Sequence, residues 1–434
     1  IYMRINPDWS FKPVALKVYY GWIIWVVSAL GILCTIPGQT VGIAAFTDSF
    51  IEVLSISRTQ LSIAYLIGTV ISSFFLTWAG KCFDILGARA MISMTSICFS
   101  LSIIYLSFVD TIGSLLGGSN LGNLGAITFG FFLVRFLGQG VLTNCSRNIL
   151  LLWFDKKRGL VVGMRAVIIS FGFSTAPLFL GSLIGAGGWK ETLWLLALLT
   201  GLCFSAFAFI FIRDNPKSCG LEMDGLALTP ELKVKNSAES VTLLQAKKSP
   251  IFWIYSLSFC AHAMFITAVI FHITSIFEEA GKSSAEAFSY FIPAAIFSTT
   301  TNMFTSWLSD KITLRPLLIL MLVVFALGCL GVINLKQEWG FWLLAFGFGT
   351  GSGLWGVLTN LTFIRFFGPN YIGEISGFSA SLSVFSSAMG PALFSICYDL
   401  FGSYTAPAKL SLILILGLLA GSMVINQKEP SRNP

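Results

Sequence analysis

The stretch GKCFDILGAR at residues 80–89 decides the fold, because a second copy, SWLSDKITLR at residues 306–315, repeats its aspartate and arginine at the same spacing. Each copy joins two long apolar segments. Two hydrophobic halves with the same charged loop at the same place indicate a membrane protein built from internal repeats, an arrangement that is common among transporters.

The composition independently indicates a membrane protein. Of the 434 residues, 55% are hydrophobic and 11% are charged, and the mean hydropathy is +0.82. About 20 helical residues cross a hydrocarbon core of roughly 30 Å, and lipid offers backbone groups no partner outside a helix. We therefore expect an all-α membrane protein with twelve transmembrane helices in two pseudo-symmetric six-helix bundles. The expected spans are 21–46, 61–79, 90–109, 125–152, 160–184, 191–212, 251–277, 285–308, 316–334, 340–365, 375–398 and 407–426.

The polar loops predict the domains and the orientation. Residues 1–213 form an N-terminal six-helix bundle, residues 214–249 a cytoplasmic linker, and residues 250–434 a C-terminal six-helix bundle. Most of the 27 Lys and Arg residues fall in the two tails and in the loops after even-numbered spans. By the positive-inside rule both termini are cytoplasmic. We predict a multi-pass protein of the plasma membrane, or of the cell inner membrane in a bacterium.

Several functions are disfavoured by what the sequence lacks. The nine cysteines are scattered without zinc or disulfide spacing, so we expect no metal and no cofactor. The net charge of +7 is explained by the basic loops, so we expect no nucleic acid partner. The sequence contains neither a serine–histidine arrangement nor paired carboxylates that would indicate an enzyme. The linker is too short for a catalytic domain, which implies an energy source other than ATP.

The repeated loop resembles the signature of the major facilitator superfamily between spans 2 and 3. The first copy matches it at each position, and the second keeps the aspartate and the arginine. Three further stretches are similar to motifs of the fourth, fifth and eleventh spans: RFLGQG at 135–140, GFSTAP at 172–177 and SSAMGP at 386–391. The resemblance implies a monomeric secondary transporter in which spans 1, 4, 7 and 10 line a central cavity.

A narrower resemblance is to the monocarboxylate and oxalate:formate porters. YGWIIW at 20–25 is similar to their glycine- and tryptophan-rich first span. WFDKKRGLVVG at 153–163 is similar to the aromatic and basic run that opens their fifth span. The resemblance implies the fold of this branch but not a lactate-like solute, because Gln39 or Thr40 stands where animal monocarboxylate carriers have a first-span lysine.

The repeated loop also predicts a gate. Asp84 ends span 2 and Arg89 begins span 3, so the pair could clasp two helix ends when the cytoplasmic side is packed shut. The alternative is that these charges only set topology and cap helices. The predicted gating residues are Gly80, Asp84, Gly87, Arg89, Asp310 and Arg315.

Span 4 carries the best candidates for solute binding. Arg135, Gln139, Thr143 and Arg147 recur every fourth residue and form one polar stripe on an apolar helix. Arg165 lies at a depth similar to that of Arg147, and no acidic residue is nearby in sequence. Guanidinium groups in this setting predict a carboxylate solute. The alternative is that Arg135 bonds backbone carbonyls of span 1 and the other two arginines snorkel to the interface.

The remaining candidates lie on other cavity-lining spans. His262 and His272 are the only histidines, and histidine titrates in the range that a proton-coupled carrier needs. Trp355 could stack on a solute. Gln39 and Thr40 follow a Pro-Gly pair at which span 1 can bend and expose carbonyls. Packing is the alternative for the histidines and for Trp355.

The sequence therefore predicts a secondary active transporter that moves a small organic solute, an organic anion such as a carboxylate, by alternating access. It would be coupled to protons or work by exchange. The alternatives are an exporter or importer of a larger amphiphile, such as a siderophore or a drug, and a transporter-like sensor.

Overall fold

The structure is a computed structural model that describes residues 6, 8–9, 11–16, 18–225 and 241–425. Helices connected by turns make up the described residues, in which no strand occurs. The expected all-α fold class is confirmed. Residues 226–240 of the predicted linker lie outside the described part.

Ten helices of the described chain are long and apolar enough to cross a membrane. Two of the twelve expected spans differ from this pattern for local reasons. The first span is interrupted at a proline, Pro37, and becomes two shorter helices. The eighth is the helix Phe291–Ser309, whose run of Ser, Thr and Asn lowers its hydropathy.

Contacts divide the chain into two units. Unit 1 contains residues 1–156, 168–240 and 369–381, and unit 2 contains residues 157–167, 241–368 and 382–434. The first residues of the fifth span are therefore grouped with unit 2, and those of the eleventh span with unit 1. Each unit is described below by itself.

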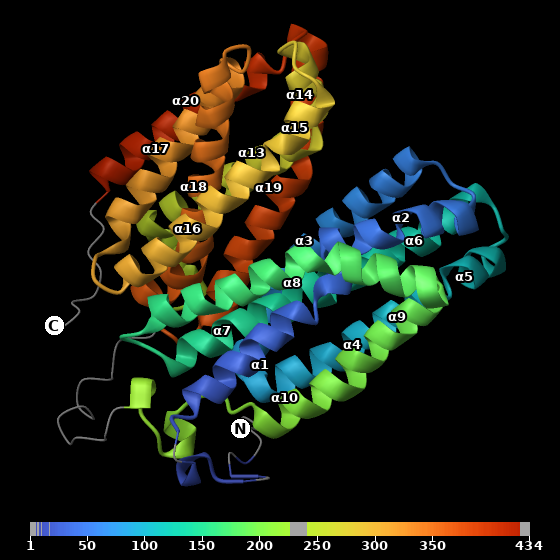
Figure 1. The fold of residues 1–434 in the computed structure, drawn as a ribbon. Coiled ribbons are helices and arrows are strands. Elements are labelled where there is room, and N and C mark those ends of the chain that lie inside the picture. Colours follow the sequence, from blue (N-terminus) through green and yellow to red (C-terminus); the bar gives the residue numbers. More distant parts are fainter. Residues whose placement is uncertain (1–5, 7, 10, 17, 226–240, 426–434) are drawn as a thin grey trace. The chain divides into compact units, whose positions relative to one another are not determined.

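Unit 1 is built on the first six spans (Figure 1). Its fourth span includes a π-helical segment, η3, and its third and fourth spans are joined by the short helix α5. The elements are α1 (Gly21–Leu33), η2 (Ile36–Gly38), α2 (Thr40–Leu54), α3 (Arg58–Leu86), α4 (Ala88–Ser107), α5 (Val109–Leu115), α6 (Asn120–Val134), η3 (Arg135–Leu142), α7 (Thr143–Trp153), α8 (Arg158–Gly187), α9 (Trp189–Leu198), η4 (Leu199–Phe204) and α10 (Ser205–Phe211).

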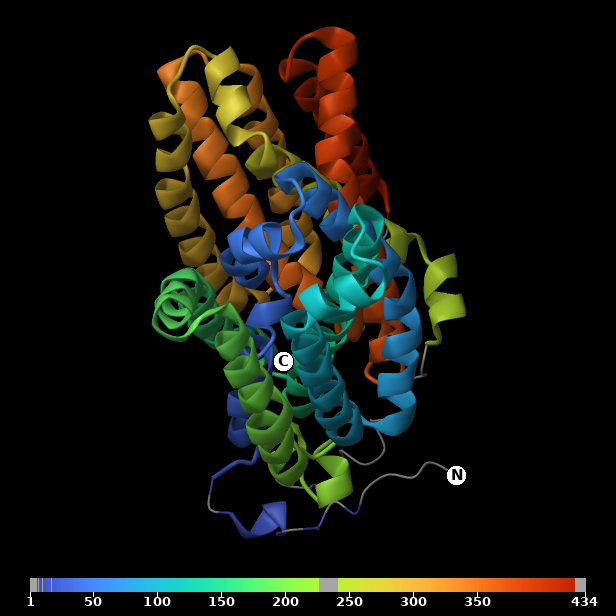
Figure 2. The ribbon, with the colours of Figure 1, turned by 90° about the vertical axis from the view of Figure 1, so that its right-hand side faces the viewer.

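Unit 2 is built on the last six spans, which are drawn from yellow to red in Figure 2. Helix α18 packs against both α16 and α17. Its first span bends at His272, where α13 ends and α14 begins. The elements are α12 (Leu243–Lys248), α13 (Pro250–Phe271), α14 (Ile273–Glu279), α15 (Ser284–Ser289), α16 (Phe291–Ser309), α17 (Leu314–Ile333), α18 (Glu338–Phe367), α19 (Ile372–Phe401) and α20 (Thr405–Val424).

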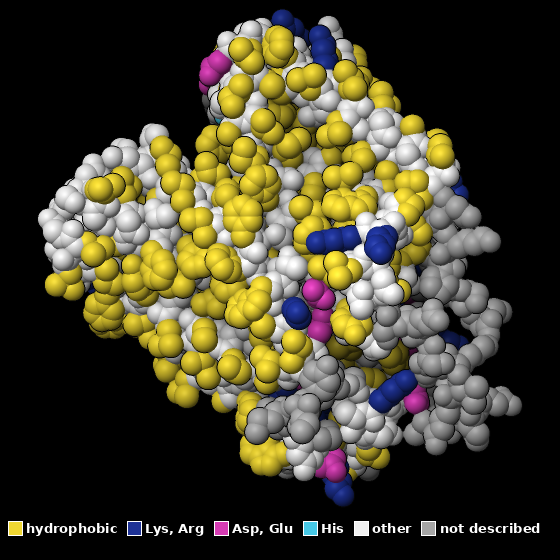
Figure 3. Space-filling model, turned by 180° about the vertical axis from the view of Figure 1, so that it is seen from behind, with side chains coloured by type: hydrophobic (Ala, Val, Ile, Leu, Met, Phe, Trp, Pro, Cys, Tyr) yellow, Lys and Arg dark blue, Asp and Glu magenta, His cyan; other side chains and the backbone are white. Residues whose placement is uncertain are grey.

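The outer surface is apolar, as a lipid-facing surface must be. Hydrophobic side chains are spread over the face drawn in Figure 3, and charged side chains are few on it. Large exposed apolar side chains occur in both units; examples are Phe74, Trp78, Leu101, Phe171, Leu178, Ile292, Phe304 and Ile413.

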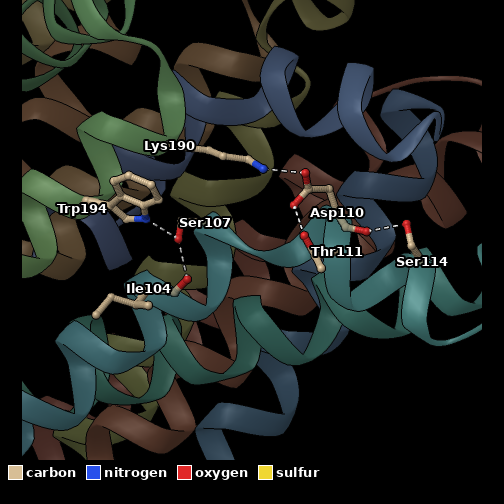
Figure 4. Close-up of polar contacts among 7 residues, drawn as sticks. All are labelled: Ile104, Ser107, Asp110, Thr111, Ser114, Lys190 and Trp194. Carbon is tan, nitrogen blue, oxygen red and sulfur yellow. Dashed lines mark hydrogen bonds and ion pairs between the residues drawn. The ribbon is translucent and has the colours of Figure 1, made fainter.

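Short polar contacts fix the connections of unit 1. At the junction of α4, α5 and α9, the Lys190 ammonium lies 2.6 Å from an Asp110 carboxylate oxygen, and the Trp194 indole donates a hydrogen bond of 2.8 Å to Ser107 (Figure 4). Between α3 and α4, Gly87 has a φ of 84°. A side chain at Gly87 would be strained and would meet the carboxylate of Asp214.

Candidate functional site

The break in the first span creates a polar site in unit 1. Helix α1 ends at Leu33, and the chain turns through η2 before α2 begins at Thr40. The carbonyl of Gly38 accepts a hydrogen bond of 3.2 Å from the Arg135 guanidinium on η3. A Cβ at Gly38 would lie 2.5 Å from the carbonyl oxygen of Val134, so only glycine allows this approach.

Arg135 is the buried charge at the centre of this site. Its side chain is 5% exposed, and its guanidinium lies 5.0 Å from the centre of the Tyr65 ring. The Nε atom is buried and has no hydrogen-bond partner. Within the described chain no carboxylate forms an ion pair with Arg135. The contact to Gly38 agrees with the structural alternative for Arg135, but it leaves the cation without an anion.

Neutral polar groups complete the site around Arg135. The Gln39 amide donates to Thr35 at 3.0 Å and to Thr143 at 3.3 Å. Thr40 and Tyr65 share a hydrogen bond of 2.8 Å between their hydroxyl groups. The structure thus brings the predicted residues Arg135, Gln39, Thr143 and Thr40 together.

Two residues of this site were missed by the sequence reasoning, and the predicted Gln139 is less closely tied to it. Thr35 and Tyr65 were not selected because no spacing or motif separates them from the other hydroxyl and aromatic residues of spans 1 and 2. Gln139 is half-buried on η3.

Arg165 belongs to unit 2. It is 2% exposed, and its guanidinium donates a hydrogen bond of 3.0 Å to the Asn360 side chain on α18. Asn360 in turn donates to the backbone carbonyl of Gly356 at 2.6 Å. Arg165 thus has a hydrogen-bond partner within the protein, and its role in solute binding stays a prediction.

Unit 2 contains a second polar cluster, which is aromatic and buried. His262 on α13 is 2% exposed, and its Nε2 lies 3.2 Å from the Ser352 hydroxyl on α18. The Trp355 ring stacks on the imidazole with 5.8 Å between centroids and 26° between planes. Phe325 meets the same imidazole edge-on at 5.1 Å. Two predicted residues, His262 and Trp355, are therefore in direct contact, and Ser352 of the same stretch of span 10 is the third member of the cluster.

His272 lies in a different environment of unit 2. Its Nε2 donates to the carbonyl of Pro391 at 3.0 Å, because a carbonyl can only accept. Its Nδ1 lies 3.3 Å from the Tyr404 hydroxyl. Glu279 accepts a hydrogen bond of 2.8 Å from the Tyr404 backbone N–H. His272 is half-buried and fully engaged at the bend between α13 and α14.

The repeated aspartates both bind the amino-terminal ends of helices. Asp84 accepts hydrogen bonds of 2.8 Å from the backbone N–H groups of Gly373 and Glu374 at the start of α19, within unit 1. Asp310 accepts bonds of 2.7 and 2.9 Å from Gly159 and Leu160 at the start of α8, within unit 2. These groups have no intrahelical partner, and the helix dipole favours negative charge there.

The two arginines of the repeated loop do not pair with the aspartates, contrary to the clasp that the sequence suggested. Arg89 donates to the backbone carbonyls of Phe209 and Trp9 at 2.7 and 3.4 Å, and Arg315 donates to the carbonyl of Met423. Backbone N–H groups at a helix start donate to both oxygens of each aspartate, whereas the arginines, which can only donate, bond backbone carbonyls instead. In unit 2 an ion pair of 3.6 Å joins Asp310 to Arg365 instead.

Gly80 allows the close approach that brings the first of these caps together. A Cβ on Gly80 would lie 2.0 Å from the carbonyl oxygen of Gly373 and would separate α3 from the start of α19.

Comparison with known proteins identifies the family. Residues 28–391 match the model of the Major Facilitator Superfamily. That match covers most of the chain, and the protein belongs to this family. A curated relative, the 2-nitroimidazole transporter of Escherichia coli (strain K12), is 27% identical over 185 residues, which are 40% of this chain and 46% of that protein. The chain thus matches less than half of the length of this relative.

Several solved structures of transporters share the fold. The proton:xylose symporter XylE is 16% identical with a TM-score of 0.68, over 92% of this chain and 95% of that one. A bacterial homologue of the iron transporter ferroportin is 12% identical with a TM-score of 0.71, over 92% and 98%. The human organic anion transporter MFSD10 is 16% identical with a TM-score of 0.59, over 93% and 99%. These neighbours show the fold, and the family supports a secondary transporter.

Proposed function

We propose that the protein moves a small organic anion, such as a carboxylate, across the membrane by alternating access, coupled to protons or by exchange. The observation that carries the proposal is Arg135, a buried cation whose Nε has no hydrogen-bond partner and which forms no ion pair with a carboxylate in the described chain. A charge at membrane depth costs about 3 kcal/mol even on a lenient scale, so such residues usually serve a pathway or a partner.

The chemistry around Arg135 suits a carboxylate. A guanidinium binds a carboxylate through charge-assisted hydrogen bonds, and its Nε would be one of the donors. The hydroxyl and amide groups of Thr143, Thr35 and Gln39 could bond the rest of a small polar solute. Because Tyr65 covers one face of the guanidinium, the solute would approach in the plane of the donors.

The two aspartate caps support a gating role for the repeated loop. Each carboxylate holds the first turn of a helix that belongs to the other half of the sequence. Breaking a cap would release that helix start and favour opening on the side that carries the loops. By the distribution of Lys and Arg, we propose that this side is cytoplasmic and that the protein resides in the plasma membrane.

Proton coupling, if present, fits His272 better than His262. His272 is half-buried beside the Tyr404 hydroxyl. Glu279 accepts a hydrogen bond from the backbone N–H of Tyr404. Tyr398 and Asp399 also lie close to Tyr404. Protonating its Nδ1 would turn an acceptor into a donor and disturb the contact with Tyr404 at the bend of the span. His262 is surrounded by aromatic rings and a single hydroxyl, where a charge would be costly.

The alternative is a carrier of a larger amphiphile, or a transporter-like sensor. The relative that is described as a 2-nitroimidazole transporter is named for a small heterocycle, which fits a small organic solute rather than a larger amphiphile. The human neighbour that is described as an organic anion transporter agrees with the first proposal.

A thermal-stability panel separates these functions. The purified protein would be heated with organic acids, amino acids and siderophores, since a solute that binds the folded state raises the melting temperature. We expect the largest rise with a small organic acid. A larger rise with a siderophore, and none with any acid, would favour the alternative.

A further inference from the structure

The aromatic cluster of unit 2 leaves two polar atoms buried and unused. The Nδ1 of His262 and the Nε1 of Trp355 have no hydrogen-bond partner, and the two rings are stacked on each other. Buried polar groups are almost always hydrogen-bonded, so two exceptions on adjoining rings call for a missing partner.

Gly351 provides room beside the first of these atoms. A Cβ built on Gly351 would lie 3.6 Å from Cε1 and 3.8 Å from Nδ1 of His262, which is ordinary contact rather than a clash. Ser352 and Trp355, which are half-buried, form the more open edge of the cluster. A small group could therefore reach Nδ1 without displacing the backbone.

The electrostatic surroundings decide what kind of group fits. In the described part of the chain, no charged side chain forms a hydrogen bond or an ion pair with His262, Ser352 or Trp355. An ion buried here would stay unpaired and would be strongly disfavoured. The indole N–H is a donor only. The imidazole can present either a donor or an acceptor, depending on how it shares a proton with Ser352.

We propose that His262, Ser352 and Trp355, with the space left by Gly351, form a subsite that binds a neutral oxygen of the transported solute, a carbonyl or hydroxyl group. The oxygen accepts from the Trp355 indole and bonds Nδ1 of His262. This proposal rests on the proposed function in one respect: the bound oxygen is part of the transported solute. It would make unit 2 the half that selects solutes by their neutral groups.

The test uses nitrogen-15 NMR of the full-length protein labelled at histidine. The chain has two histidines, so His272→Gln assigns the ring signals of His262. The probes are N-methylacetamide, which carries one neutral carbonyl, and acetate, which is charged. We expect N-methylacetamide to shift the His262 signals and acetate to leave them unchanged.

Variants show whether the proposed atoms bind the probe. Gly351→Ala fills the space, and Trp355→Phe removes the indole N–H but keeps a ring; each should weaken the apparent affinity for N-methylacetamide about five- to tenfold, the effect of one neutral hydrogen bond. The matched controls are Gly417→Ala, where a Cβ meets nothing within 4 Å, and Trp342→Phe, where the side chain is 59% exposed. Both controls should respond like the parent.

Two results would overturn the subsite. One is an unchanged His262 response in Gly351→Ala. The other is no response to N-methylacetamide in the parent, which would leave an ordered water as the only partner of Nδ1. The response should persist in Arg135→Ala, so a failure of the anion proposal would not be mistaken for a failure of the subsite.

Discussion

The polar clusters of the two units use opposite means to keep polar groups in an apolar protein. In unit 1 a broken helix exposes a backbone carbonyl that accepts a hydrogen bond from the charged Arg135, and the buried Nε of Arg135 has no partner. In unit 2 the helix α13 runs unbroken past His262, and the polar atoms are neutral and enclosed by aromatic rings. The first arrangement suits an anion, and the second suits a neutral group.

The comparison suggests that repeated halves diverge in their interiors while they keep their loops. The aspartate caps are alike in both units, with two backbone N–H groups on each carboxylate. The helix starts in both halves present free backbone N–H groups, and a carboxylate accepts hydrogen bonds from them equally well in each half. A solute is not symmetric, so the residues that bind it need not be.

The largest effect is expected from removing the charge of unit 1. Arg135→Ala should lower the affinity for an organic acid by more than two orders of magnitude. Arg135→Lys should lower it by roughly one to two orders, because the charge stays while the planar donors are lost, an effect of about 1.5–3 kcal/mol. Calorimetric titration would measure both. Arg213→Lys, a buried arginine of the same unit that bonds the Trp9 carbonyl, is the control.

Substituting the two histidines should separate coupling from solute selection. His272→Gln should reduce pH-driven uptake about tenfold and leave solute exchange intact, since exchange need not change the protonation of the carrier. His262→Gln should retain pH-driven uptake. Uptake into proteoliposomes with and without a pH gradient would test this. Normal pH-driven uptake in the His272 variant would assign coupling elsewhere.

The aspartate caps should affect rate more than affinity. Asp84→Asn keeps the shape of the side chain but loses its charge, so the first turn of α19 is held less firmly. We expect turnover to fall several-fold, because the substitution weakens a charge-assisted contact that holds the helix start. Solute affinity should change less than about twofold, because the cap does not include the residues proposed to bind the solute. Asp310→Asn is the matched variant of unit 2. Parental turnover in both variants would refute the gating role.

The smallest effect concerns the ion pair that joins α5 to α9. Partial burial opposes ionisation of Asp110, but the hydrogen bond and the charge of Lys190, together with backbone hydrogen bonds, outweigh it and hold the pKa of Asp110 below its usual range. Lys190→Met should therefore cost less than about 1 kcal/mol of stability, as exposed pairs do. The cost should be present above the unfolded carboxyl pKa of about 3.9 and disappear as the pH falls through the lower native value. Chemical denaturation over a range of pH measures it.

Patterns that repeat along the chain were predictable from the sequence. Hydrophobic segments of membrane length gave the all-helical fold, and the stripe on span 4 led to Arg135 and Thr143 because their spacing is that of a helix face. The bend near Gln39 followed from Pro37. Partners from distant segments were not predictable. Nothing in sequence spacing tells that Asp84 meets the start of α19 rather than Arg89, or that Tyr65 covers Arg135.

The most direct test of the account compares an acid with its own methyl ester. The organic acid that stabilises the protein most would be titrated, with its ester, into the parent and into Arg135→Ala. If Arg135 holds the negative group, the parent prefers the acid by at least about tenfold, as expected for a charge-assisted contact, and the variant binds both forms equally. If the variant keeps the preference of the parent for the acid, Arg135 is structural and the anion assignment is wrong.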